Sequence, residues 1–457
     1  MKAPLTELET QLMVGLCTAT MFMQMLVALT CTHTKRFSVQ AYIGNCSWVC
    51  GIFLTAKTYN PIWLLLIPAV RVMFCFVYVY FGNIQEDITT MYLYNDFFEN
   101  VTRKLKGSDF FTEGDYKGLV PFDNLDHSDA NLKHANEWAH KVYESYAKNP
   151  KLIEPEDKSL NDDVMIKSQF GKQKWIIDNL GLTKDSRVLE MGFGKLDLML
   201  YIRKATGATV EGTNLSQEQI NRAKKNGFNA YLISHLDIHK HAKELGQYDL
   251  VISDGSLEYL VHNSSEYHET HSHKVFDHFI KEGICPLLKP GGRWFTTTLH
   301  VNLVPPSKSY AVCDSYVARK LNRIRNIYNL YVLSSGNEGG YPFAPDQMTN
   351  LAERHGLTIK LHQNRTIDYM LYSWSWMLLQ IETWRKQSLL EKTITQLKHL
   401  ACLWVAPNYF ESYLCYTPNL FGAITGPFYI PWLWQFLRQE DGFTPVTHYW
   451  IVSEKPK

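Results

Sequence analysis

Three apolar runs lie within the first 82 residues of the chain. Residues 11–31 carry no charge, residues 61–82 carry one charge at Arg71, and a shorter run covers residues 39–56. A helix of about 20 apolar residues is long enough to cross the hydrocarbon core of a bilayer. We therefore expect residues 1–82 to form a transmembrane anchor of two or three helices. A buried soluble helix hairpin, or a cleaved signal peptide for the first run, is the alternative.

A different pattern begins near residue 167, where short apolar segments alternate with amphipathic ones. Amphipathic helices are expected at Gln169–Leu180 and Val275–Leu288, with a turn at Lys289–Gly292. The expected strands are Arg187–Met191, Thr209–Thr213, Asn229–Ser234, Tyr248–Ser253 and Arg293–Leu299. This alternation predicts an α/β fold, a doubly wound parallel sheet with helices on both faces.

The polar residues between these two regions predict a third unit. Residues 83–160 mix charges with helical patches such as Leu132–Ala147, so we expect a helical connector that packs on the α/β domain. That domain then covers residues 161–457. Its last part, from Trp404 to Phe436, is rich in aromatic residues interrupted by proline and glycine. We expect this stretch to face lipid, either as the wall of an acyl tunnel or at the membrane interface, with an ordinary core as the alternative.

Charge narrows the range of partners and suggests an orientation. The chain has 46 Lys and Arg against 45 Asp and Glu, a net charge of +1. This balance argues against a globally basic nucleic-acid binder. Basic clusters at 35–36 and 103–106 follow the first and last apolar runs. With three spans both clusters lie on one side, which the positive-inside rule makes cytosolic, so we expect a multi-pass membrane protein with a cytosolic catalytic domain, in the endoplasmic reticulum if the source is eukaryotic.

The loop after the first expected strand carries the candidate chemistry. It reads Val188-Leu-Glu-Met-Gly-Phe-Gly-Lys-Leu-Asp, with Glu190 two residues before Gly192 and Gly194 two after it. Glycines at the carboxyl end of a strand let the backbone turn sharply and approach a ligand. A dinucleotide-binding loop would have a third glycine where Asp197 stands. The pattern instead resembles the Glu/Asp-x-Gly-x-Gly motif of class I S-adenosylmethionine-dependent methyltransferases, so S-adenosyl-L-methionine is the expected cofactor.

Further segments resemble the cyclopropane-fatty-acid synthase and mycolic acid synthase family. Val210-Glu-Gly-Thr-Asn-Leu-Ser-Gln-Glu-Gln is similar to the family's Gly-x-Thr-Leu-Ser-x-x-Gln segment. The resemblance implies cofactor contacts at Asn214 and Gln219. The other residues expected at the cofactor are Glu190, Gly192, Gly194, Leu215, Asp237 and Ser253. No metal is expected.

The resemblance also implies two catalytic residues and several departures. Gly255-Ser-Leu-Glu-Tyr-Leu and Asp368-Tyr-Met-Leu-Tyr-Ser-Trp-Ser-Trp carry the family's acid to Glu258 and its tyrosine to Tyr369. The cysteine of the family's bicarbonate site has no counterpart, and its histidine falls on Thr297, three residues before His300. A bicarbonate site of the usual composition is therefore not expected.

The layout of the chain is similar to that of membrane-anchored sphingolipid methyltransferases. We expect a membrane-bound lipid methyltransferase that transfers a methyl group to a carbon–carbon double bond of an acyl chain or long-chain base. One alternative is a cyclopropane fatty acid synthase. Another is a catalytically inactive cofactor- or lipid-binding relative, since Lys195-Leu-Asp replaces the family's Gly-Trp-Gly.

Overall fold

The computed structural model describes residues 113–122, 124–126, 128–148, 162–257, 260, 269–301, 345–394 and 446–457, with the single residues 11, 50 and 54. The expected anchor at residues 1–82 and the aromatic stretch at 404–436 thus lie outside the described residues, apart from those three positions. Within the described part of the chain, no helix combines the length and the apolar character that a membrane span requires.

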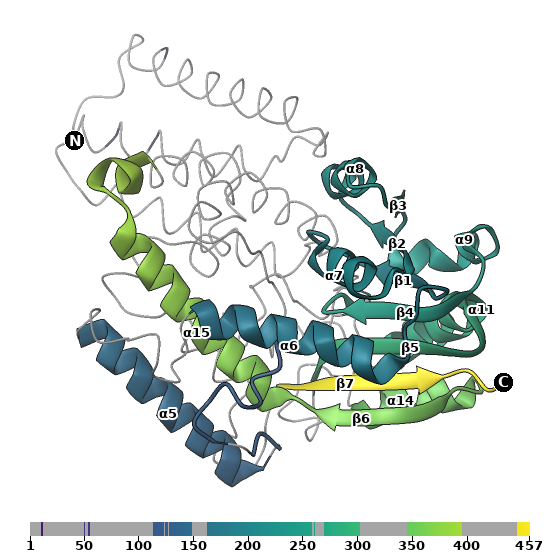
Figure 1. The fold of residues 1–457 in the computed structure, drawn as a ribbon, viewed down its shortest axis with the longest axis horizontal. Coiled ribbons are helices and arrows are strands. Elements are labelled where there is room, and N and C mark those ends of the chain that lie inside the picture. Colours follow the sequence, from purple (N-terminus) through teal and green to yellow (C-terminus); the bar gives the residue numbers. More distant parts are fainter. Residues whose placement is uncertain are drawn as a thin grey trace, which may run out of the picture.

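A seven-stranded sheet forms the centre of the described part, in the order β3-β2-β1-β4-β5-β7-β6 (Figure 1). Its strands are β1 Arg187–Met191, β2 Thr209–Asn214, β3 Asn229–Leu232, β4 Tyr248–Asp254, β5 Leu288–Val301, β6 Thr358–Asn364 and β7 Val446–Glu454. Strands β1 to β5 are mutually parallel, whereas β7 runs antiparallel to both of its neighbours. The doubly wound α/β fold is confirmed, with a sheet that is mixed rather than wholly parallel. The antiparallel strand β7 was not predicted.

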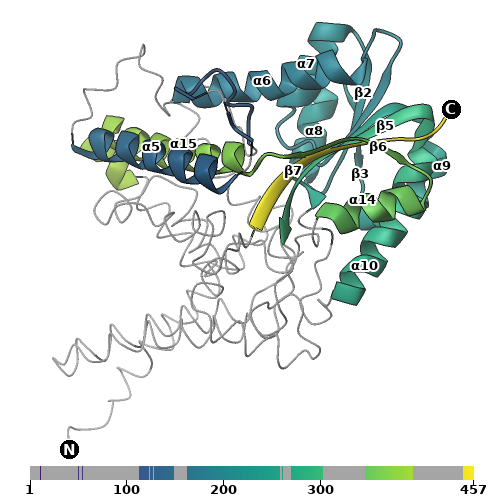
Figure 2. The ribbon, with the colours of Figure 1, turned by 90° about the horizontal axis from the view of Figure 1, so that it is seen from below.

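Helices cover both faces of the sheet (Figure 2). One face is covered by α6 Asp162–Leu180, α7 Asp197–Thr206 and α8 Gln217–Lys225, and the other by α9 Ile238–Leu245, α10 Glu269–His278, α11 Cys285–Leu287 and α14 Pro345–Arg354. Alternation of side chains along the strands explains the two layers. In β1, Val188 packs with Ile176 of α6 and Ile202 of α7, whereas Leu189 belongs to the core on the opposite face.

Two long helices, α5 Asp129–Lys148 and α15 Thr366–Lys386, lie side by side and extend beyond the sheet (Figures 1 and 2). The indole N–H of Trp374 in α15 donates a hydrogen bond to Asn136 of α5 at 3.2 Å. Leu132 of α5 and Leu371 of α15 are buried in the same core. The helical patch expected at Leu132–Ala147 is therefore confirmed as α5. The domain boundary at residue 160 stays a prediction.

The sequence around Lys289–Gly292 forms a bulge rather than the expected turn. The pairing of β4 with β5 jumps from Tyr248 opposite Leu288 to Leu250 opposite Arg293. Gly291 has φ +78°, a conformation that favours glycine. The chain thus enters β5 at Leu288 and loops out within the strand, so the expected turn and the expected strand belong to one element.

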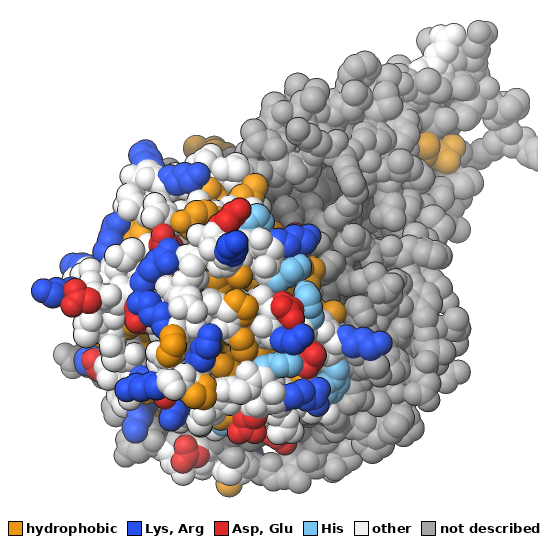
Figure 3. Space-filling model, turned by 90° about the vertical axis from the view of Figure 1, so that its right-hand side faces the viewer, with side chains coloured by type: hydrophobic (Ala, Val, Ile, Leu, Met, Phe, Trp, Pro, Cys, Tyr) orange, Lys and Arg blue, Asp and Glu red, His pale blue; other side chains and the backbone are white. Residues whose placement is uncertain are grey.

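The face near the C-terminus, on the right of Figure 1, carries mixed charge (Figure 3). There Lys and Arg side chains alternate with Asp and Glu over the surface. Elsewhere in the fold, the last turns of α7 and α8 are basic and contain Arg203, Lys204, Arg222, Lys224 and Lys225. Cations at helix C-termini interact favourably with the helix dipole, which gives these residues a structural explanation.

Candidate functional site

The loop between β1 and α7 adopts a backbone shape that depends on its glycines. Gly192 and Gly194 have φ +77° and +49°, and Leu196 has φ +81°. The N–H of Gly192 donates to the carbonyl of Thr213 at the end of β2, at 2.8 Å. A Cβ on Gly192 would lie 2.9 Å from Cβ of Ser256, whereas a Cβ on Gly194 would meet no atom of the described residues within 4 Å. The first glycine is therefore required for packing, and no described side chain packs on the second, which lies at the carboxyl edge of the sheet.

Two polar side chains, Ser256 and His235, support this loop. Ser256 donates to the carbonyl of Met191 at 3.1 Å, and its oxygen lies 3.0 Å from Nε2 of His235. Burial lowers the pKa of His235 to about 4, so the imidazole is uncharged at neutral pH. The loop is thus anchored without adding a positive charge to the site.

Glu190 is the residue of the loop motif with the most unusual environment. It lies in β1 opposite Gly212 and Ile252, and its side chain is buried. Its Oε2 atom has no hydrogen-bond partner among the described residues. The pKa of Glu190 is raised to about 8. Burial is the main cause, nearby Asp254 contributes to the rise, and Lys172 opposes it. Since a buried carboxyl oxygen without a partner is costly, this atom fits a donor or cation supplied by a ligand.

The end of β2 brings the next group of predicted residues to the same edge. Oδ1 of Asn214 accepts the N–H groups of Leu215 and Ser216 at 2.7 and 3.1 Å, which closes a tight turn. Ser216 then caps α8 by accepting from the N–H of Gln219 at 3.3 Å. Leu215 is exposed and Gln219 is buried. The structure therefore brings Asn214, Leu215 and Gln219 together next to the glycine loop.

Two other predicted cofactor residues are engaged elsewhere. Asp237, half-exposed before α9, pairs with Lys240 at 2.6 Å. The hydroxyl of Ser253 is fully buried, where it accepts from the indole of Trp294 at 3.2 Å and lies 4.0 Å from the sulfur of Met191. None of these bonds joins Asp237 or Ser253 to Gly192 or Gly194. Their roles at the cofactor stay predictions.

Of the two predicted catalytic residues, the structure describes only Tyr369. Glu258 lies outside the described residues. Tyr369 is partly exposed in the first turns of α15, and its ring packs against His448 with centroids 4.9 Å apart and against Tyr372 at 5.7 Å. His448 belongs to β7, opposite Leu299 of β5. Thr297, which the resemblance gives as the position of the family's histidine, lies two residues before Leu299 in β5. An imidazole on this part of the sheet belongs to His448 of β7.

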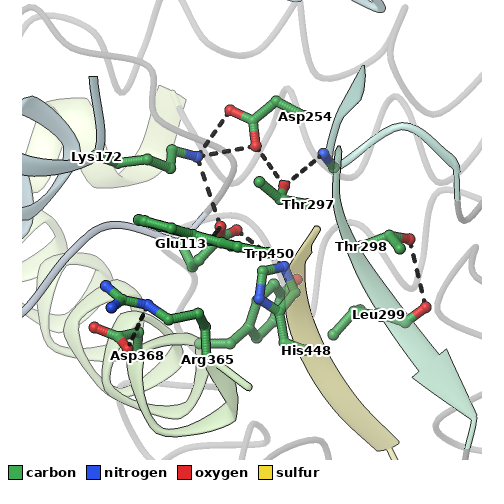
Figure 4. A network of polar contacts seen from close by, with 12 residues as sticks. Glu113, Lys172, Asp254, Thr297, Thr298, Leu299, Arg365, Asp368, His448 and Trp450 are labelled. Atoms are coloured by element: carbon green, nitrogen blue, oxygen red, sulfur yellow. Dashed lines mark hydrogen bonds and ion pairs between the residues drawn. The ribbon is translucent and has the colours of Figure 1, made fainter. Parts of the chain in front are cut away.

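A buried ion pair joins α6 to Asp254 at the end of β4, opposite Thr297 of β5 (Figure 4). Nζ of Lys172, from α6, is 2.8 and 3.0 Å from the two carboxylate oxygens of Asp254. The hydroxyl of Thr297 donates to Asp254 at 2.6 Å and accepts from the N–H of Gly255 at 3.1 Å. Lys172 is 2% exposed and the Asp254 side chain 11%, so this ion pair has little contact with water. This pair fixes the start of the loop that leads to residue 258.

Glu113 extends this polar group toward β7 (Figure 4). Its Oε1 accepts from the indole of Trp450 at 2.7 Å and lies 3.8 Å from Lys172, and its Oε2 lies 3.3 Å from Nε2 of His448. Burial raises the pKa of Glu113 to about 8, which Asp254 reinforces and Lys172 opposes. Burial also lowers the pKa of His448 well below its usual range. Both shifts favour the uncharged form of the side chain, so burial disfavours charge on Glu113 and on His448 alike.

A second buried ion-pair group fixes the segment that carries Glu113. Arg365 lies 2.7 Å from Asp115 and 3.1 Å from Asp368, and its guanidinium stacks over the ring of Trp450 at 4.1 Å. The N–H of Tyr116 donates to Asp368 at 2.9 Å. Residues 113–116 are in this way attached to α15 and β7.

Sequence reasoning missed Glu113, Lys172, Asp254 and His448. Lys172 lies in α6. The sequence pattern predicted that this helix is amphipathic but did not predict that Lys172 is buried. Asp254 directly follows the apolar strand Tyr248–Ser253, a position at which a polar residue is a usable signal. Glu113 and Trp450 are 337 residues apart, so their contact depends on the tertiary fold.

Comparison with known proteins adds structural neighbours. No family model matches the sequence, and no curated protein matches it significantly. The cyclopropane synthase MmaA2 from Mycobacterium tuberculosis is similar at 12% identity and TM-score 0.40, covering 64% of this chain and 85% of that one. Mycolic acid cyclopropane synthase CmaA1, solved with S-adenosylhomocysteine (SAH) and CTAB, is similar at 14% identity and TM-score 0.43, over 72% and 99%.

A third neighbour is the geranyl diphosphate C-methyltransferase from Streptomyces coelicolor A3(2), solved with Mg²⁺, geranyl diphosphate and SAH. It shows 16% identity and TM-score 0.37, and covers 79% of this chain and 97% of that one.

Proposed function

We propose that this chain is an S-adenosyl-L-methionine-dependent methyltransferase. The observation that carries the proposal is the loop at the carboxyl end of β1. Among the described residues, nothing packs on Gly194 and nothing hydrogen-bonds the buried Oε2 of Glu190. In open α/β sheets, ligands bind at this edge, where the strand order reverses between β1 and β4. The residues that would hold the cofactor are Glu190, Gly192, Gly194, Asn214, Leu215 and Gln219.

The bound cofactor would supply an electrophilic methyl group on a sulfonium sulfur. The chain's own part is then to hold and shield the reactants. Glu190 offers a negative or acidic oxygen next to the loop, and the turn at Asn214 fixes the end of β2. The buried pair of Lys172 and Asp254 keeps the neighbouring edge rigid, which matters because methyl transfer depends on close alignment.

The proposed acceptor is a lipid acyl chain or long-chain base, methylated at a carbon–carbon double bond. This part of the proposal is supported by the sequence: the resemblance to lipid-modifying enzymes, the apolar runs in residues 1–82 and the aromatic stretch at 404–436. Charge that develops on the alkene needs an environment without water. Tyr369 and Glu258 are the residues proposed to face the alkene. The proposed protein has a multi-pass membrane anchor and a cytosolic catalytic domain.

The test is calorimetric binding of S-adenosylmethionine and SAH to the full chain in detergent. We expect the wild type to bind both, and Gly194→Val to lose at least about tenfold in affinity because its side chain would fill the open space next to the loop. Gly356→Val is the matched control. Gly356 also has positive φ, +80°, and a Cβ there would meet no atom within 4 Å in the described part of the chain, but it lies between α14 and β6.

The outcomes distinguish an active enzyme from an inactive relative. Binding that is lost in Gly194→Val and kept in Gly356→Val supports the proposal. A wild type that binds neither compound overturns it. Binding without methyl transfer to any lipid would support the alternative of an inactive cofactor-binding relative.

A further inference from the structure

Three carboxyl groups share one lysine at the carboxyl edge of the sheet. Glu190, Asp254 and Glu113 are the three carboxyls, and Lys172 is the lysine; we refer to them together as the carboxyl row. Lys172 is 2.8 Å from Asp254 and 3.8 Å from Glu113, and its charge also acts on Glu190. The row lies on the face of the sheet that α6 covers, and three of its four members are at most 5% exposed.

The members of the row differ in how their charge is satisfied. Asp254 takes the close contact with Lys172 and a hydrogen bond from Thr297. Glu113 is hydrogen-bonded by Trp450 and faces His448. Oε2 of Glu113 and Oε2 of Glu190 are both buried without a hydrogen bond from the described residues, but the first lies 3.3 Å from Nε2 of His448. Glu190 stands two residues before the glycine loop, so its oxygen is the one next to the proposed cofactor site.

We propose that Glu190 is protonated in the cofactor-free protein and releases its proton to solvent when a cationic group of the methyl donor occupies the glycine loop. The O–H bond of the carboxyl breaks, its electron pair stays on Glu190, and the resulting carboxylate pairs with the incoming cation. This inference rests on the proposed function, because it takes S-adenosylmethionine as the ligand. Two groups of that ligand are cationic, the sulfonium and the amino-acid ammonium, and SAH keeps only the second.

The charges around Glu190 explain why the proton is held and why it would leave. Burial is the main factor that raises the pKa of Glu190 to about 8. Asp254 from β4 and Asp197 at the start of α7 raise it further, while Lys172 from α6 lowers it. From β2 the opposite residue is Gly212, which carries no charge. An opposite charge within a few ångströms lowers the pKa of a carboxyl by about 1 to 3 units, enough to ionise it at neutral pH.

The test measures protons rather than turnover. S-adenosylmethionine is titrated into the full chain in detergent at neutral pH, in two buffers with different ionisation enthalpies, since the difference in heat reports the protons released. We expect release of close to one proton, and an affinity that rises by up to about tenfold per pH unit between about pH 6.5 and 8. The same titration with SAH identifies the cation: release with both compounds assigns the ammonium, and release with S-adenosylmethionine alone assigns the sulfonium.

Two carboxyl-to-amide variants locate the proton. Glu190→Gln copies the shape of the protonated side chain and should abolish the release and flatten the pH dependence of affinity. Glu113→Gln, the matched control at the other end of the row, should leave the release unchanged. Binding without proton release in the wild type, or release that persists in Glu190→Gln, would overturn the inference. If Glu190→Gln does not fold, the wild-type comparison of two buffers still decides, whereas absence of binding to the wild type contradicts the proposed function itself.

Discussion

At the scale of single residues, the site combines groups whose proton affinities are moved in opposite directions. Glu113 and Glu190 both have a pKa raised to about 8 by burial, whereas burial lowers the pKa of His448. Tyr369 packs on His448 and is partly exposed among the described residues. Under the proposed function, Tyr369 would face a substrate on which positive charge develops.

Removal of one hydroxyl tests the role of Tyr369. Tyr369→Phe keeps the ring contact with His448 and loses the phenol, so we expect methyl transfer to fall by about tenfold to a thousandfold with cofactor affinity unchanged. Tyr372→Phe, which alters the ring packed at 5.7 Å from Tyr369, is the matched control and should retain the activity. The measurement is transfer of label from methyl-labelled S-adenosylmethionine to lipid. Equal rates for Tyr369→Phe and wild type would remove Tyr369 from the catalytic site.

At the scale of elements, the segment 113–116 holds the helices to the sheet. Glu113 contacts Lys172 of α6 and Trp450 of β7, and Asp115 contacts Arg365 at the start of α15. These are buried charges, and each depends on its partner because an isolated charge in the interior is costly. The segment therefore joins α6, α15 and β7, elements that are far apart in the sequence.

Loss of the shared lysine should destabilise this junction. Lys172→Met removes the ammonium that lies 2.8 Å from Asp254, and we expect the free energy of unfolding to fall by about 3–5 kcal/mol. Lys174→Met on the same helix breaks only an exposed pair with Asp178, so it should change stability little. Denaturant unfolding in detergent measures both variants. A Lys172→Met protein as stable as Lys174→Met would show that the buried pair contributes nothing.

At the scale of the whole molecule, the sequence predicted the sheet better than the site. Local signals gave β1 and its loop, because glycine spacing and an apolar strand are read within ten residues. The antiparallel strand β7 follows more than 140 residues after β5, and its pairing depends on the tertiary fold. Asn214 and Gln219 belong to one short segment after β2, so the sequence could place them beside the loop. Glu113 and His448 are far apart in the sequence, so their contact could not be predicted.

The buried carboxyls also make a prediction about the stability of the whole fold. A carboxyl with a raised pKa binds more protons in the folded than in the unfolded state between about pH 4.5 and 8, so stability falls as pH rises through that range. His235, with a pKa lowered to about 4, has the opposite effect, which is complete once the pH exceeds about 6.5.

Between about pH 6.5 and 8 only the carboxyl effect remains, and we expect a loss of about 1.4 kcal/mol per pH unit from each of Glu113 and Glu190. Denaturant unfolding of the cofactor-free protein at the two pH values measures the slope. Glu190→Gln should reduce it by about half. A wild-type protein whose stability is constant over this range would mean that neither carboxyl is protonated at neutral pH.

The proposed activity of this chain is methyl transfer from S-adenosylmethionine to a lipid, with the cofactor held by the glycine loop after β1. The decisive assay incubates the full chain, reconstituted in vesicles of unsaturated phospholipid and an unsaturated long-chain base, with methyl-labelled S-adenosylmethionine. We expect label in the lipid fraction, on the carbon chain rather than the headgroup, with wild type and Gly356→Val but not with Gly194→Val. Cofactor binding with no label in any lipid, or equal labelling by Gly194→Val, would contradict this activity.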